Sequence, residues 1–312
     1  MQKNKILISW HYLMPLSQKY KNLFKKENID YDTISVNPSL KENQLLKIVH
    51  KYDGIICGDD EITKKVIDKA KKLKVISKWG TGLDSIDVNY AKKKNILICN
   101  SPKAFVESVT VYAFGLLINL SRGLFKIHSL VMKNKWEKYS GVELLNKNLG
   151  IIGFGNIGEN IAKVGTAFGM NILINDSNKK KKLKILKYGF SFVSKSKVLK
   201  KSDFLILATD LNKSSFHLLD FKDFEIIKKN LILINISRGP VINEKALIKY
   251  IENKKIGGIG LDVFENEPLK RNHIFKKFNN AIFGSHNAFN TKEAVNRTND
   301  DCVLNLIKAL KN

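Results

Sequence analysis

Cysteine is scarce in this chain of 312 residues, which contains only Cys57, Cys99 and Cys302. Their number is odd, they lie far apart, and no two of them form a C-x-x-C pair. A disulfide framework and a zinc site of the usual spacing are therefore both excluded. We expect a reduced, cytoplasmic setting and no bound metal.

Long hydrophobic runs are also missing. No stretch of about 18 apolar residues occurs, which argues against a membrane-spanning helix. The apolar N-terminal segment ends before His11, which is too short for a secretory signal and indicates a first buried strand. Hydrophobic residues still make up 44% of the chain, enough for sizeable cores in the two domains that its length predicts.

Arginine is the third scarcity. The net charge is +25, yet only Arg122, Arg238, Arg271 and Arg297 among the 54 basic residues are arginines. Nucleic-acid recognition relies on arginine's planar fork, and the lysines are scattered among many Asn and Ile residues. This pattern indicates a compositional bias, so we expect no nucleic-acid partner. The run KKKK at 179–182 is most simply a solvated loop or helix face.

Short runs of branched aliphatic residues alternate with lysine-rich amphipathic segments such as 42–52 and 63–74. This alternation is typical of parallel βαβ units. The strand candidates of a first section are 5–9, 31–36, 54–57, 74–77 and 96–100. Those of a second section are 148–154, 171–176, 204–209, 231–237, 257–263 and 281–285.

Two successive α/β sections are thus predicted, with a seam near residue 100. Ser101-Pro102 is a good start signal for a helix, and apolar residues follow at helical spacing from 105 to 120. A last helix, at about 291–310, follows the second section and could pack back against the first.

A glycine-rich turn opens the second section. Gly153, Gly155 and Gly158 have G-x-G-x-x-G spacing, between a predicted strand and a helix beginning near Asn156. Such a turn lets backbone approach a pyrophosphate at a helix N-terminus, although a purely structural turn has the same spacing. The next strand ends at Asp176, where a carboxylate can accept bonds from ribose hydroxyls and disfavour a 2′-phosphate.

NAD is therefore the predicted cofactor. Lys179 and its neighbours leave some use of NADP open. The predicted cofactor-binding residues are Gly153, Gly155, Asn156, Ile157, Gly158, Asp176, Thr209 and Asp262.

The stretch GLDVFENEP, at 260–268, gathers three carboxylates in a basic chain. It follows a predicted strand, as do Arg238 and His286, and ligands in open α/β sheets bind at the carboxyl ends of strands. Taken singly, these residues could be a solvated acidic turn, a surface ion-pair residue and an ordinary loop histidine. Together they suit hydride transfer to a ketone, because histidine can protonate the oxygen and arginine can grip a carboxylate. Glu267 would then hold His286 in its charged form.

The chain resembles the D-isomer-specific 2-hydroxyacid dehydrogenases, the family that includes phosphoglycerate dehydrogenase. The resemblance covers essentially all 312 residues. It rests on KWGTGLDSID (78–87), the glycine-rich turn, NISRGPVINEKAL (235–247), GLDVFENEP and the SHNA around His286. It implies an α/β fold of two doubly wound parallel-sheet domains. A Rossmann NAD-binding domain, 101–286, would be inserted in a flavodoxin-like substrate-binding domain, 1–100 plus 287–312.

The resemblance also implies roles and partners. The family's catalytic Arg, Glu and His fall on Arg238, Glu267 and His286, and the Asp that meets the nicotinamide carboxamide falls on Asp262. Its loop of backbone amides for the substrate carboxylate is consistent with an anion nest. That loop, with the basic residue before it, falls on Lys78, Trp79, Gly80 and Thr81. A homodimer is implied, with the helix near 103–121 at its interface.

Three departures from the family pattern bear on function. Ser285 replaces the proline usual before the catalytic histidine, and Thr110 or Val111 replaces a common acidic residue. Where phosphoglycerate dehydrogenases carry phosphate-binding arginines, this chain has Lys78 and, at the other place, Gly58 beside two aspartates. This departure weakens 3-phosphoglycerate as the substrate.

The leading hypothesis is an NAD-dependent oxidoreductase that interconverts a D-(R)-2-hydroxy acid and its 2-keto acid. A narrower alternative is a 3-phosphoglycerate dehydrogenase. An alternative of another class is a non-catalytic, corepressor-like NAD-binding partner, which would have no use for a retained Arg, Glu and His. Trp10, His11, Tyr12 and Trp79 are candidates for lining the substrate site, although a packing role is open for each.

Overall fold

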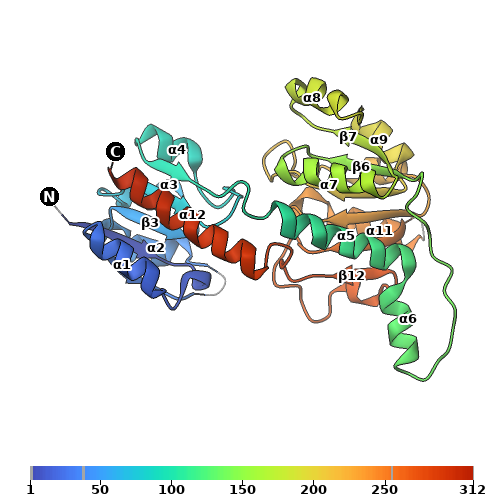
Figure 1. The fold of residues 1–312 in the computed structure, drawn as a ribbon, viewed down its shortest axis with the longest axis horizontal. Coiled ribbons are helices and arrows are strands. Elements are labelled where there is room, and N and C mark those ends of the chain that lie inside the picture. Colours follow the sequence, from blue (N-terminus) through green and yellow to red (C-terminus); the bar gives the residue numbers. More distant parts are fainter. Residues whose placement is uncertain (1–2, 37–38, 254–255, 312) are drawn as a thin grey trace. The chain divides into compact units, whose positions relative to one another are not determined.

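The computed structural model describes the chain except residues 1–2, 37–38, 254–255 and 312. The chain divides into two compact units (Figure 1). The first comprises Met1–Phe105 with Asn290–Asn312, and the second comprises Val106–Phe289. In the described residues each unit contains one wholly parallel sheet with helices between its strands. The predicted fold class, two doubly wound α/β domains, is confirmed.

The first unit has a sheet of strand order β2-β1-β3-β4-β5. Its strands are β1 (Asn4–Ile8), β2 (Ile29–Thr33), β3 (Gly54–Cys57), β4 (Val75–Lys78) and β5 (Leu97–Cys99). Its helices are α1 (Gln18–Lys26), α2 (Glu42–Ile48), α3 (Lys64–Lys69), α4 (Val88–Lys93) and α12 (Lys292–Lys311), with short 3-10 turns η1 (His11–Leu13) and η2 (Val49–Lys51). The chain leaves β1 towards β2 on one side and then crosses to β3 on the other. The sheet therefore has its topological switch point at the carboxyl ends of β1 and β3.

The C-terminal helix α12 belongs to this first unit (Figure 1). Its buried face includes Cys302 and Leu306, and the carbonyl oxygen of Cys302 accepts a 2.8 Å hydrogen bond from Ser77 Oγ of β4. A Cβ on Gly54 of β3 would lie 3.3 Å from Leu306 Cδ1, so the helix packs directly on the sheet. The last helix thus returns to the first section, as the sequence suggested.

The second unit has strand order β12-β11-β10-β9-β6-β7-β8. Its strands are β6 (Asn148–Ile152), β7 (Asn171–Asn175), β8 (Ser191–Phe192), β9 (Phe204–Leu207), β10 (Leu231–Asn235), β11 (Ile256–Leu261) and β12 (Ala281–Phe283). Its helices are α5 (Val106–Arg122), α6 (Leu124–Val131), α7 (Asn156–Ala167), α8 (Lys182–Lys187), α9 (Lys195–Lys201), α10 (Phe221–Glu225) and α11 (Glu244–Glu252), with 3-10 turns η3 (Lys179–Lys181), η4 (Gly239–Val241) and η5 (Ile274–Lys277). The switch point lies between β6 and β9, directly beyond the glycine-rich turn.

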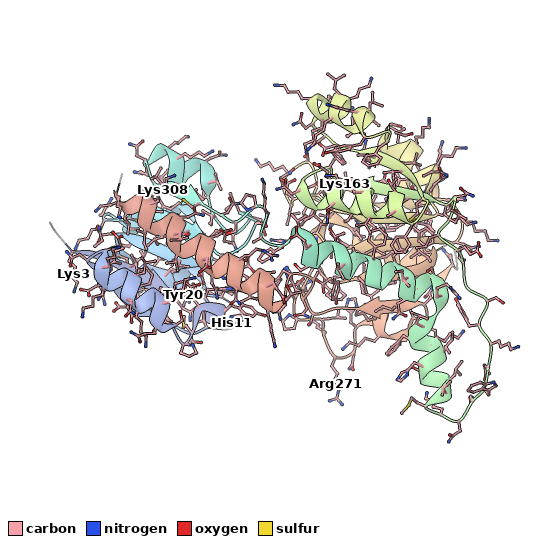
Figure 2. The ribbon with its side chains drawn as sticks, in the orientation of Figure 1. Lys3, His11, Tyr20, Lys163, Arg271 and Lys308 are labelled. Carbon is pink, nitrogen blue, oxygen red and sulfur yellow. The ribbon has the colours of Figure 1, made fainter. Side chains whose placement is uncertain are left out.

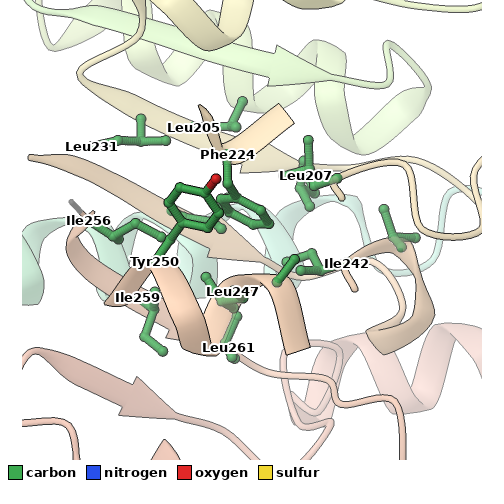
Figure 3. Packing of buried hydrophobic residues seen from close by; sticks show 14 of the residues in the cluster. Leu205, Leu207, Phe224, Leu231, Ile242, Leu247, Tyr250, Ile256, Ile259 and Leu261 are labelled. Carbon is green, nitrogen blue, oxygen red and sulfur yellow. The ribbon is translucent and has the colours of Figure 1, made fainter. Parts of the chain in front are cut away.

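Aliphatic side chains from the middle of this sheet form the core beneath α10 and α11 (Figure 3). Phe224 and Tyr250 stack at its centre, with ring centroids 5.5 Å apart, over Leu205 of β9 and Leu247 of α11. Strands covered on both faces need the continuous apolar runs seen in the sequence, such as LILIN at 231–235. This core fixes the carboxyl ends of the strands, where the site residues lie.

Four details differ from the predictions. The segment 63–74 is helical only over α3, because Lys74 N–H already donates to Asp53 O beside β3. A turn occupies 102–105, so α5 begins at Val106 and not directly after Pro102. β8, with two residues, is too short to show alternation and was not predicted, and neither was α6.

The abundant lysines are distributed over the surface (Figure 2). Lys3 precedes β1, Lys163 lies on α7 and Lys308 lies on α12, and all three are exposed. No single described helix is long and apolar enough to cross a membrane, although α5 and α6, bent by 62°, meet that length and composition together.

Glu159 of α7 is the centre of an ionic cluster on the second unit. Its carboxylate accepts hydrogen bonds from Lys163 Nζ (2.9 Å), Tyr188 Oη (2.8 Å) and Lys184 Nζ. Burial alone would raise the pKa of Glu159, but these donors lower it from 4.5 to about 2. The folded protein therefore favours the ionised form of Glu159. This cluster stabilises the fold at pH values above the pKa of Glu159 in the unfolded chain.

We expect Glu159→Gln to lower the free energy of unfolding by about 1 kcal/mol at pH 7. The difference from wild type should close as the pH falls from 4.5 towards about 2, because wild type then loses the charge as well. Urea denaturation at several pH values measures it, with the exposed Glu252→Gln as the control. A difference that stays constant from pH 7 to pH 3 would contradict the assignment.

Candidate active site

The glycine-rich turn connects β6 to α7, and the structure shows why glycine is needed at two of its positions. Gly153 has φ +99°, and a Cβ there would come within 2.4 Å of Ala208 O and 2.8 Å of Thr209 N. A Cβ on Gly158 would lie 2.0 Å from Gly153 O. A Cβ on Gly155, by contrast, would meet no atom within 4 Å, so the exposed side of the turn is open. The turn and Thr209 thus lie together at the switch point of the sheet.

Asp176 follows β7 beside this turn and is 7% exposed. Its Oδ2 accepts from Phe154 N–H (2.7 Å) and Lys181 Nζ (2.8 Å), and its Oδ1 accepts from Asn178 N–H (2.7 Å). Burial works to raise the pKa of Asp176, but the bonds from Lys181, Phe154 and Asn178 lower it. The carboxylate is therefore ionised, and Oδ1 retains the capacity to accept a ribose hydroxyl.

These features fit the predicted dinucleotide. The turn presents open backbone at Gly155 and a helix N-terminus at Asn156, and Asp176 supplies an acceptor at the end of the next strand. Gly153, Gly155, Asn156, Ile157, Gly158 and Thr209 would hold the pyrophosphate side of NAD, and Asp176 the ribose. Among the described residues no group of three His, Cys, Asp or Glu side chains is arranged to hold a metal ion.

Arg238, Glu267 and His286 come from three loops of the second unit, and the structure brings these loops together. His286 Nδ1 lies 2.8 Å from Glu267 Oε2, and Phe264 N–H donates to Glu267 Oε1 at 3.0 Å. A Cβ on Gly239, the residue after Arg238, would lie 1.8 Å from the carbonyl carbon of Phe264. The backbone of the arginine loop is therefore in direct contact with the acidic loop.

The charges of this group support one another. Burial works to raise the pKa of Glu267, but the bond and charge of His286, the Phe264 N–H and the charge of Arg238 lower it overall. Glu267 is therefore a carboxylate at neutral pH. An ionised partner at hydrogen-bond distance favours the protonated imidazole. The pair can hold a proton on His286 until the ring's other nitrogen, Nε2, gives it up.

His286 has φ +57°, a left-handed conformation that costs a non-glycine residue roughly 1–2 kcal/mol. Asp262 holds it there. Its main-chain carbonyl accepts from His286 N–H (2.7 Å), while its carboxylate accepts from the N–H groups of Asn287 and Ala288, both at 2.9 Å. Tyr112 of α5 donates to the same carboxylate, and a Cβ on Gly284 would lie 2.0 Å from Asp262 Oδ1.

Asp262 is thus 1% exposed, and its observed bonds position the histidine loop. The predicted contact with a nicotinamide carboxamide would be an additional role for Asp262.

Tyr112 of α5 is a residue for which no role was predicted. Burial and the neighbouring Asp262 raise its pKa to about 12, so it stays a hydrogen-bond donor.

Glu265 is a second residue for which no role was predicted. Its Oε1 lies 2.8 Å from His217 Nε2 and accepts from Glu244 N–H at 3.2 Å. The two residues are bonded a second time, because Glu244 Oε1 accepts from Glu265 N–H at 2.8 Å. His217 N–H donates to Pro240 O, two residues after Arg238. Glu265 therefore ties the loop of Glu267 to the loops that carry Arg238 and Thr209.

In the first unit, the predicted substrate loop follows β4. Trp79 N–H donates to Cys57 O at 2.8 Å, so the loop offers fewer amides than the three predicted. Gly80 has φ +117°, and in the described part of the chain no hydrogen bond from the N–H of Gly80 or Thr81 is formed. Two adjacent backbone donors at the end of a buried strand are suited to a carboxylate.

The aromatic residues predicted to line the substrate site form one cluster in the first unit. Trp10 and Tyr12 lie 5.4 Å and 5.2 Å from Trp79 by ring centroids, and His11 lies 4.6 Å from Trp10. Trp79 Nε1 donates to Asn299 Oδ1 of α12 at 2.7 Å, so Trp79 has a packing role at least.

The structure shows the surroundings of the residues that depart from the family pattern. Thr110 is buried and accepts a 3.2 Å hydrogen bond from Asn160 Nδ2, which ties α5 to α7. Val111 is 72% exposed, and Ser285 is exposed beside His286. Nothing in the structure explains why serine stands at 285.

Comparison with known proteins agrees with this geometry. The sequence profile described as "D-isomer specific 2-hydroxyacid dehydrogenase, NAD binding domain" matches residues 114–288. The chain is 34% identical over 294 residues to a hydroxypyruvate reductase of Thermotoga maritima, covering 92% of this chain and 93% of the relative. It is 34% identical over 260 residues to a glyoxylate reductase of Thermococcus litoralis, covering 80% and 78%. A D-lactate dehydrogenase of Aquifex aeolicus, solved with NAD and lactic acid, is 27% identical with TM-score 0.84, covering 99% and 95%.

We expect Asp262→Asn to destabilise the loop that carries His286. The carboxylate accepts from two backbone N–H groups and from Tyr112, whereas an amide has one oxygen that accepts and one nitrogen that only donates. The free energy of unfolding should fall by about 1–3 kcal/mol, and the amides of Asn287 and Ala288 should exchange hydrogen faster. Urea denaturation and hydrogen-exchange mass spectrometry measure the two effects. Asp203→Asn, which removes another carboxylate bound to a backbone N–H, is the matched control: it should lower stability without changing exchange at 287–288.

Proposed function

Because the chain belongs to the D-isomer-specific 2-hydroxyacid dehydrogenase family, we propose that His286, Glu267 and Arg238 carry out the proton transfer and substrate binding of its reaction. The protein is an NAD-dependent D-2-hydroxyacid dehydrogenase, interconverting a 2-hydroxy acid and its 2-keto acid. The observation that carries the proposal is the 2.8 Å pair of His286 Nδ1 and Glu267 Oε2 beside the charge of Arg238. Family membership and this retained group favour an enzyme over a non-catalytic binding partner.

Bound NADH supplies the hydride. In the reducing direction His286 gives its Nε2 proton to the carbonyl oxygen, and Glu267 stabilises the imidazolium before transfer. Arg238 binds the substrate carboxylate with parallel N–H donors and polarises the neighbouring carbonyl. In the first unit, the amides of Gly80 and Thr81 are proposed donors for a substrate carboxylate. In the oxidising direction neutral His286 accepts the hydroxyl proton.

The relatives include reductases of glyoxylate and of hydroxypyruvate, so small 2-keto acids are the proposed substrates. A cytoplasmic location is proposed with them. It is supported by the absence of disulfides among the described cysteines: Cys57, Cys99 and Cys302 are all free thiols.

We further propose a homodimer in which the α5–α6 region is the interface. α6 has no buried residue and projects from the end of α5 (Figure 1). Exposed apolar side chains continue from it into the following segment. The most exposed are Phe125 (64%), Met132 (71%) and Trp136 (89%). Large apolar side chains that are exposed in such number are typical of a protein–protein contact.

His286→Ala is expected to lower kcat for glyoxylate or hydroxypyruvate reduction by about 10²–10⁴-fold while NADH binding stays unchanged. Glu267→Gln is expected to keep part of the activity. Its rate should decline at lower pH than in wild type, because reduction needs a protonated imidazole and the carboxylate that favours it is gone. NADH oxidation at 340 nm across pH and NADH fluorescence measure these effects. Equal rates in wild type and His286→Ala would remove the assigned acid.

For the cofactor, Asp176→Ser should weaken NADH binding at least tenfold and NADPH binding less, because the lost carboxylate accepts from a ribose but repels a 2′-phosphate. Lys181→Ala should weaken any remaining NADPH binding, because it removes an ammonium that lies 2.8 Å from Asp176 and would attract a 2′-phosphate. Fluorescence titration of each variant gives the dissociation constants. An NADH affinity unchanged in Asp176→Ser would contradict the ribose role.

For the dimer, Phe125→Ser with Trp136→Ser should shift wild-type dimers towards monomers in analytical ultracentrifugation, because large aromatic side chains dominate interface energies. Leu183→Ser with Leu186→Ser, which removes exposed apolar residues from α8, is the matched control. A wild-type protein that is monomeric at micromolar concentration would overturn this part of the proposal.

A further inference from the structure

Lys78 places a buried positive charge at the end of β4. Its side chain is only 5% exposed, and its Nζ donates to Asp59 Oδ1 at 2.9 Å and to Trp79 O at 3.2 Å. A Cβ on Gly80 would lie 3.9 Å from the same nitrogen. The ammonium therefore lies against the loop whose Gly80 and Thr81 amides are proposed to bind a carboxylate.

Two carboxylates interact with the charge of this ammonium. Asp59, from the loop after β3, forms the ion pair with Lys78 and is half exposed, with 50% of its side chain accessible. Asp60 is fully buried, accepts from Ser9 Oγ and from Leu40 N–H, and lies within reach of the Lys78 charge. The ammonium is therefore already paired with one acid, and its charge acts on a second. Among these described side chains, no unpaired positive charge is left for another anion.

An aromatic side chain, Trp10, lies beside these charges, and its indole N–H has no hydrogen-bond partner among the described residues. Trp10 follows β1, and its indole lies so close to Gly58 that a Cβ there would be 1.7 Å from the ring. Trp10 is 8% exposed, and its Nε1 has no hydrogen-bond partner among the described residues. Since β1 and β3 form the switch point of this sheet, Trp10, Gly58 and Asp59 lie where such sheets bind ligands.

We propose that Asp59 is a specificity-determining residue, which restricts the enzyme to 2-keto acids that carry no second anionic group. By neutralising Lys78, it leaves the amide loop to bind one carboxylate and makes a second carboxylate or a phosphate unfavourable. The inference rests on the proposed function and narrows it to monoanionic substrates, against phosphorylated or dicarboxylic ones.

The test compares kcat/KM for two monoanionic acids, glyoxylate and hydroxypyruvate, with kcat/KM for two acids of higher charge, oxaloacetate and phosphonooxypyruvate. Wild type should prefer the monoanionic acids at least 100-fold. Asp59→Asn keeps the shape of the side chain and frees the ammonium. It should raise kcat/KM for the charged acids at least tenfold and change the monoanionic values less than threefold. Adding Lys78→Met to it should abolish the gain, because the freed ammonium is its cause.

Asp30→Asn is the matched control, because Asp30 is equally exposed (54%) and pairs with a lysine of the same unit, Lys3. It removes the same charge and should leave the substrate ratio unchanged. Asp59→Ser serves as a second variant, with circular dichroism to verify folding. An unchanged ratio in both Asp59 variants, or an equal gain in Asp30→Asn, would overturn the proposal.

The proposed function and this inference fail in different ways. If wild type reduces no 2-keto acid, the proposed function fails. Calorimetric binding of D-glycerate and 3-phospho-D-glycerate to the NADH-loaded protein then decides the role of Asp59. Tighter binding of the phosphorylated acid to Asp59→Asn than to wild type would support it, and equal binding would overturn it. If wild type is active but accepts charged and monoanionic acids equally, the function stands and the inference fails.

Discussion

The hydrogen bond between His286 Nδ1 and Glu267 Oε2, 2.8 Å long, is the interaction on which the proposed chemistry of this protein depends. It joins residues 19 apart in the sequence, and neighbouring residues hold each of them in place. Asp262 fixes the histidine in a left-handed backbone conformation through three main-chain N–H groups. Glu265 and the close approach of Gly239 hold the acidic loop against the loop of Arg238. Preorganisation of this kind is what proton transfer requires, because a small displacement of the acid lowers the rate steeply.

Both units use the same structural device at the carboxyl ends of their strands. A glycine at the switch point lets another group come closer than any side chain would permit. Gly153 admits the backbone of Ala208 and Thr209, and Gly58 admits the indole of Trp10. Parallel strands also direct their following loops to one edge, so polar residues far apart in sequence meet there. The high net charge has little part in this, since the lysines are dispersed over the surface. Among the lysines that the structure describes, Lys78 is the buried exception, and Asp59 pairs with it.

The sequence by itself determined the fold class, the cofactor and the candidate catalytic residues. Each rests on a local signal: aliphatic runs at strand length, glycine spacing before a helix, and polar residues directly after strands. Where the signal was short or continued past the true boundary, the prediction was wrong. The two residues of β8 show no alternation, and the lysine-rich periodicity of 63–74 continues beyond the end of α3.

Only the tertiary structure decided which of these residues bind one another. No spacing in the sequence shows that Asp59 pairs with Lys78 across neighbouring strands, that Glu265 meets His217, or that the carboxylate of Asp262 holds the backbone after His286. These contacts depend on strand order and register, which long-range burial selects. Composition and periodicity report what each segment buries. The geometry of the assembled sheet determines which charges lie within about 3 Å of each other, and that distance decides their chemistry.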